Sequence, residues 1–120
     1  MPHRNRTDRQ IAQDARSRVR VVRQGPGAVV VALPGRIANE EAEKVGRLLI
    51  ALLQAALPVR LDLSLTTGLE TGAQAALFRL LRAAGQASVT VTAHRPGPAV
   101  RAALRTSGLD RAMTCTDQPA

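Results

Sequence analysis

Residues 29–64 read VVVALPGRIANEEAEKVGRLLIALLQAALPVRLDLS, and this stretch decides the fold class. It opens within the aliphatic run 28–33, which predicts a central strand. Asn39, followed by three glutamates, favours a helix N-terminus, with Asn39 as the N-cap. Apolar residues then recur at helical spacing until Pro58 ends the helix, and residues 59–64 alternate as a strand does. Such a strand–helix–strand unit places two parallel strands in one sheet.

The segments on either side extend this unit. Residues 19–22 alternate and are separated from the run 28–33 by the turn at residues 25–27, which predicts an antiparallel hairpin. Residues 71–84 have helical periodicity that ends at Gly85, and residues 98–107 predict a last helix that ends at Gly108. Alternation over 89–93 and a short segment at 112–116 predict two further strands.

One face of the predicted sheet carries polar side chains. Arg60, Asp62, Thr90 and Thr92 alternate with aliphatic residues, whereas strands covered on both faces are apolar throughout. The sequence therefore predicts an α/β fold with a mixed, mostly parallel sheet of about five strands and helices packed on one face.

The 120 residues are enough for one domain, and 45% of them are hydrophobic. The core must be aliphatic, because Phe78 is the only aromatic residue. No secretory signal is visible at residues 1–18, and the longest apolar stretch, 45–57, is shorter than the ~20 residues of a membrane span. The single Cys115 fits a reducing compartment. We therefore expect a cytoplasmic protein without membrane insertion.

The net charge of +8 is concentrated near the N-terminus. Residues 1–24 hold seven arginines and two aspartates, hence +5. Residues 1–17 lack apolar periodicity, so we predict a disordered basic arm that is dispensable for folding. The domain organisation predicted is a basic arm at 1–17, the folded domain at 18–117 and a tail at 118–120.

The chain offers no constellation of catalytic or metal-ligating residues. His94 follows a strand and is expected in a surface loop, Cys115 is expected as a small apolar residue, and no metal-ligand spacing occurs. Asp62 and Glu70 have no acid, base or ligand beside them that would make them a catalytic pair. We therefore predict that the protein is not an enzyme and has no cofactor.

Three local motifs, in this order, resemble the STAS domain, the fold of bacterial anti-sigma factor antagonists. The motifs are LPGRI at 33–37, LDLS at 61–64, and GPAVR at 97–101 with SGL at 107–109. The resemblance runs from about Val19 to Cys115. It implies a docking module for regulatory proteins.

The family's functional signature, D-S-x-G-L, lies at the start of the second helix of the domain, where a partner kinase phosphorylates the serine. The matching stretch here is LETGA at 69–73, so Glu70 replaces the aspartate, Thr71 replaces the serine and Gly72 comes one residue early. The resemblance makes Thr71 the candidate for phosphorylation. The alternative is structural, since Thr71 and Gln74 match the capping box S/T-x-x-E/Q.

The predicted partner-binding residues are Glu70, Thr71, Gly72, Gln74, Ile50 and Leu53. Ile50 and Leu53, with Leu57, form a second apolar line on the helix from Asn39. That line either widens the core stripe or contacts a partner.

The resemblance implies partner switching in transcription control, by binding an anti-sigma factor or serine-threonine kinase of the ATPase fold. One alternative is a STAS subunit of another complex, such as a lipid-transport ATPase assembly. A second is a small basic nucleic-acid-binding protein that uses the arginine-rich arm, although the chain lacks the aromatic residues of a single-strand platform.

Overall fold

The structure is a computed structural model that describes residues 7–120, with the backbone alone at positions 23 and 24. Five strands form the main sheet, namely β1 (Arg20–Gln24), β2 (Val29–Ala32), β4 (Val59–Asp62), β6 (Val91–His94) and β7 (Thr114–Thr116). A two-stranded sheet contains β3 (Gly35–Ile37) and β5 (Thr66–Leu69). The helices are α1 (Asp8–Arg18), α2 (Asn39–Ala51), the 3-10 turn η1 (Leu52–Ala55), α3 (Thr71–Ala87), α4 (Pro98–Ser107) and α5 (Leu109–Ala112).

The main sheet has the order β1-β2-β4-β6-β7. β1 is antiparallel to β2, and the other neighbouring strands are parallel. Val31 of β2 lies opposite Leu61 of β4, which in turn lies opposite Ala93 of β6, and all three are fully buried. The predicted hairpin and the mixed, mostly parallel sheet are confirmed.

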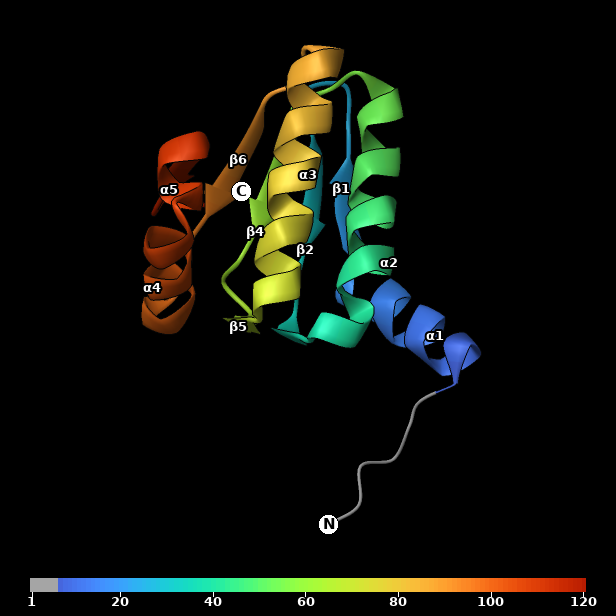
Figure 1. Cartoon of the computed structure of the whole chain (residues 1–120). Helices are drawn as coiled ribbons and strands as arrows, with labels where there is room; N and C mark the ends of the chain where they lie inside the picture. The colour runs from blue at the N-terminus through green and yellow to red at the C-terminus, as the bar shows by residue number, and fades with distance from the viewer. Residues whose placement is uncertain (1–6) are drawn as a thin grey trace.

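The helices α2, α3, α4 and α5 pack side by side on one face of this sheet (Figure 1). The core lies between the two layers, where Leu49 of α2, Leu80 of α3 and Leu104 of α4 are fully buried. On the opposite face, Arg60 of β4 is exposed, and Asp62 of the same strand and Thr92 of β6 are half-buried. The α/β fold with helices on one face is therefore as predicted. Among the described residues, no helix has both the length and the apolar character needed to cross a bilayer.

The prediction of a disordered arm at 1–17 is wrong for the part of it that the structure describes. The helix α1 begins after Thr7, whose hydroxyl accepts a hydrogen bond from the Gln10 N–H at 3.1 Å. Ala15 is completely buried against the core, and α1 packs beside the start of α2 (Figure 1). Removing residues 8–17 would expose surface that α1 now covers, so we expect the deletion to lower the stability of the domain. Residues 1–6 of the predicted arm lie outside the described part.

An ion pair also joins the end of α1 to the domain. The Arg18 Nε lies 3.5 Å from Oε1 of Glu41, whose side chain is only 1% exposed. The same guanidinium covers Gly35, which has φ +80°, and a Cβ at that position would stand 2.8 Å from Nη1 of Arg18. Gly35 is therefore favoured by its left-handed backbone, whereas the Arg18 guanidinium, as the end of a flexible side chain, could move aside for a Cβ.

Several predicted boundaries differ from the structure. The N-cap of α2 is Ala38, so Asn39 is the first helical residue. The helix α3 does not stop at Gly85 but continues to Ala87, where Ser88 ends it in the left-handed conformation at φ 57°. The strands β3 and β5 were not predicted. Gly108, with φ 86°, ends α4 as predicted.

Candidate functional site

The first turns of α2 and α3 lie side by side and cap each other. Glu70 is the N-cap of α3, and its Oε1 accepts a hydrogen bond from the backbone N–H of Asn39 at 2.8 Å. In return, Oδ1 of Asn39 accepts one from the backbone N–H of Gly72 at 2.7 Å. Each helix thus satisfies a terminal N–H group with a side chain of the other. We call these two bonds the crossed caps.

The two-stranded sheet of β3 and β5 brings the first turns of α2 and α3 together. Ile37 of β3 pairs with Leu69 of β5, and the Glu70 N–H donates to the Ile37 carbonyl at 3.1 Å. The residues that follow the two strands therefore emerge together, and they begin α2 and α3. Arg36 of β3 completes the site, since its Nε donates to Oε2 of Glu70 at 3.1 Å.

Thr71 is the first residue of α3 and is exposed. Its hydroxyl lies 3.5 Å from Oδ1 of Asn39. The predicted capping box is wrong, because Glu70 rather than Thr71 is the N-cap, and the amide of Gln74 donates to the Leu69 carbonyl at 3.0 Å. Thr71 is therefore not needed as a cap.

Gly72 lies in contact with the first turn of α2. A Cβ at Gly72 would stand 2.8 Å from Oδ1 of Asn39, 3.2 Å from the Cβ of Ala42 and 3.3 Å from the Cα of Asn39. The glycine therefore allows the crossed caps to form, which explains why the residue after Thr71 is small.

The carboxylate of Glu70 is stabilised in its charged form. The backbone N–H of Asn39 and, next, the Arg36 side chain lower its pKa below the ordinary value of 4.5. Both bonds favour the ionised carboxylate over the neutral acid. A carboxyl group whose pKa is depressed on folding adds stability above its unfolded-state pKa and loses that contribution as the pH falls through the folded value.

We expect Glu70→Gln to make the protein less stable than the wild type at neutral pH, with a difference that shrinks as the pH falls below 4.5. Glutamine can still accept the Asn39 bond, but it lacks the charge. Urea unfolding of both proteins over an acid series measures this, and a difference that stays constant with pH would contradict it.

The structure does not bring all the predicted partner-binding residues together. Glu70, Thr71, Gly72 and Gln74 lie at the start of α3. Ile50 is half-buried and Leu53 is buried, and with Ala83 of α3 they line a shallow hollow of about 490 Å³. Ala83 lies about 18 Å from Thr71 along the axis of α3. The two groups are therefore at different ends of the helix layer.

Sequence reasoning missed Arg36 and the role of Asn39 in this site. Arg36 belongs to the LPGRI motif, but its partner Glu70 is 34 positions away. Asn39 was assigned to capping its own helix, whereas its side chain caps α3. Only the pairing of β3 with β5 reveals these contacts, and both strands are too short to give a periodic signal.

The remaining candidate residues of the sequence analysis, His94, Cys115 and Asp62, lie outside the crossed caps. His94 is buried at the end of β6, where its ring bonds to the Thr92 hydroxyl at 2.7 Å and the Gln118 carbonyl at 3.1 Å, so the expectation of a surface loop is wrong. Burial raises the pKa of the half-buried Cys115 thiol in β7. Asp62 accepts two bonds from Ser64. Within residues 7–120, no group of three or more histidine, cysteine or acidic side chains could hold a metal ion.

Comparison with known protein families shows which family the chain belongs to. A family model described as "Mlab, STAS domain" matches residues 21–115. No curated protein matches the sequence.

Similar solved structures include a Thermotoga maritima protein assigned as an anti-sigma factor antagonist, with a TM-score of 0.71 and 16% identity over 83% of this chain and 85% of that one. An anti-sigma factor antagonist from Mycobacterium paratuberculosis has a TM-score of 0.69 and 24% identity, again over 83% of this chain and 85% of that one. The anti-sigma factor antagonist SpoIIAA in its unphosphorylated form has a TM-score of 0.59 and 13% identity over 78% of this chain and 96% of that one. At these identities the structures support the fold, and the family model, which spans most of the sequence, shows that the chain belongs to the STAS domain family.

Proposed function

We propose that this protein is a docking module that switches between partners, as anti-sigma factor antagonists do, and that it acts by binding rather than by catalysis. The observation that carries the proposal is the exposed hydroxyl of Thr71 at the rigid start of α3. Three structural neighbours are named as anti-sigma factor antagonists, and one of them is named in its unphosphorylated form, which supports a phosphorylation switch at the matching position.

A phosphate on Thr71 would act through charge. It would gain from the N-terminus of α3 and from the nearby guanidinium of Arg36. It would also compete with Asn39 for the Gly72 N–H and repel the carboxylate of Glu70. The modified protein would therefore stay folded but present an altered, more negative surface to its partner.

The exposed side of α3 offers a continuous contact surface beyond Thr71. Phe78 follows two turns later on the same face of the helix, and Arg82 follows one turn after that. Phe78 is 40% exposed although it is the only aromatic residue of the chain. Aromatic and arginine side chains are frequent anchors of protein interfaces. We infer that the partner, an anti-sigma factor or kinase of the ATPase fold, contacts this face.

The experiment maps phosphate by mass spectrometry on protein purified from its own host. It then measures binding of Thr71 variants to the ATPase-fold anti-sigma kinases of that host by calorimetry. Thr71→Ala is expected to bind like the wild type, whereas Thr71→Glu is expected to bind about tenfold more weakly or worse, because it adds a buried negative charge to the interface.

Thr67→Glu is the matched control, since Thr67 is exposed on β5 four positions earlier. It should bind normally. Equal binding by the Thr71 and Thr67 variants, with no phosphate on Thr71, would overturn the switch. Capture of a transporter ATPase or of nucleic acid in place of a kinase would point to another function for the fold.

A further inference from the structure

A groove between α1 and α2 lies apart from the proposed switch. Its lining residues are Ala12 and Arg16 of α1 and Lys44, Arg47 and Leu48 of α2. The helix α2 lies between α1 and α3, so the groove opens on the side of α2 that faces away from α3 (Figure 1). The helix α1 also precedes residues 21–115, the part that matches the family model, so one wall of the groove lies outside the matched part.

The wall that α1 provides is fixed to the domain. Its first turn is capped by Thr7, its middle is anchored by the buried Ala15, and its end is anchored by the ion pair between Arg18 and Glu41. The groove, of about 240 Å³, therefore exists in the folded protein and does not require α1 to move.

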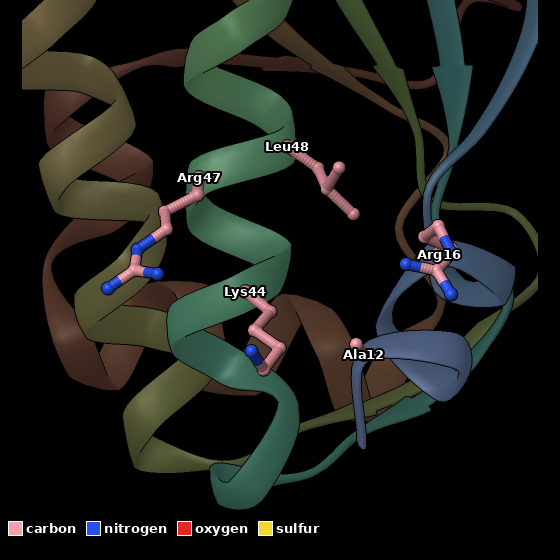
Figure 2. A pocket seen from close by; sticks show the side chains of 5 residues that line it. All are labelled: Ala12, Arg16, Lys44, Arg47 and Leu48. Carbon is pink, nitrogen blue, oxygen red and sulfur yellow. The ribbon is translucent and has the colours of Figure 1, made fainter. Parts of the chain in front are cut away.

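The groove combines an apolar floor with unpaired positive charge. Ala12 and Leu48 form the floor, and Figure 2 shows Leu48 directed toward α1, with Lys44 below it and Arg16 on the far side. Within residues 7–120, no acidic side chain forms an ion pair with Arg16 or Lys44. Arg47 extends away from α1 and pairs with Glu43, so it contributes at the rim.

We propose that this groove binds an acidic segment of a protein partner that inserts an aliphatic side chain between Ala12 and Leu48. Charge complementarity places the carboxylates of the partner segment beside Arg16 and Lys44. The apolar floor favours a peptide over nucleic acid, because a phosphate backbone would satisfy the cations but has no aliphatic group to bury there. No aromatic side chain lines the groove to stack a base.

The groove predicts a second contact that is independent of Thr71. The test titrates the full-length protein with a fluorescent synthetic peptide of repeated Glu-Leu-Glu-Glu units. A peptide of glutamates alone and a thymidine oligonucleotide serve as comparison ligands. We expect the leucine-containing peptide to bind most tightly and to shift the NMR signals of Ala12 and Leu48.

Charge reversal and steric filling test the two halves of the proposal. Arg16→Glu and Lys44→Glu should each weaken peptide binding by about tenfold. Ala12→Gln should weaken it without changing any charge, because the longer side chain fills the floor. Arg105→Glu is the control, since Arg105 is exposed on α4, on the other side of the helix layer, and it should bind normally.

Three results would overturn the proposal. One is an equal loss of binding in Arg105→Glu and Arg16→Glu, which would mean general attraction to a basic protein. Another is unchanged binding in Ala12→Gln, and the third is tighter binding of the oligonucleotide than of the peptide. Because Thr71 is intact in every variant, these outcomes leave the proposed switch untouched.

Discussion

Replacing Arg18 with alanine is expected to lower the free energy of unfolding by about 2–3 kcal/mol. Breaking a buried ion pair by removing one partner typically costs 3–5 kcal/mol, because the remaining charge is left in a poorly solvated place. Glu41 is 1% exposed, but the Arg18 side chain is 35% exposed, so water can reach part of the vacated space and reduce the loss. The substitution removes only the ion pair and leaves α1 in the chain, so the loss of stability should be measurable in the full-length protein.

Two comparisons identify the cause. Arg20→Ala removes an exposed arginine two positions later and should change stability by less than about 0.5 kcal/mol. In a Glu41→Gln background, Arg18→Ala should cost much less than in the wild type, because no buried charge is left behind. Urea unfolding at neutral pH is measured for the wild type, the three single variants and the double variant. A loss in Arg18→Ala no larger than in Arg20→Ala would show that α1 is not held by this ion pair.

The main sheet could be predicted from the sequence because its strands have strong patterns. Residues 59–62 alternate between buried and solvent-facing side chains, and residues 29–32 are buried at every position. These are the patterns of a strand with one open face and of a central strand. The helix-ending glycine at position 108 also has a local physical cause, which is its positive φ.

The helix α1 could not be found by apolar periodicity, because the residue that it buries most completely is an alanine. Ala15 is as compatible with a solvated segment as with a packed one. Arg18 contributes through its pairing with Glu41, 23 positions away, which no local pattern encodes. One signal was present, however. Thr7 and Gln10 match the capping box S/T-x-x-E/Q, and Thr7 is the N-cap of α1.

Only part of the candidate site could be predicted from the sequence, and its geometry could not. The family resemblance placed Glu70, Thr71 and Gly72 at the start of a helix, and the structure has them there. The local capping pattern then suggested the wrong bond, because it considered only residues on the same helix. The actual partner of the Gly72 N–H is Asn39, which depends on how two short strands pair.

Gly72→Ala is expected to destabilise the protein by about 1–3 kcal/mol, although alanine is the better helix former. The new methyl group would stand 2.8 Å from Oδ1 of Asn39 and 3.3 Å from its Cα. The Oδ1 atom cannot turn away without losing its bond to the Gly72 N–H, and the backbone Cα cannot yield unless α2 moves. The substitution therefore separates the two helix starts and breaks one crossed cap.

Gly85→Ala is the matched control on the same helix. Nothing lies within 4 Å of a Cβ at Gly85, so this substitution should stabilise the protein by about 0.5–1 kcal/mol through helix propensity alone. In an Asn39→Ala background, Gly72→Ala should cost less than in the wild type, because the clash with Oδ1 is gone and only the Cα and Ala42 contacts remain. Thermal and urea unfolding measure these differences. If both glycine substitutions stabilised the protein equally, α2 and α3 would not approach closely at Gly72, and Thr71 would lose the rigid frame on which its proposed role rests.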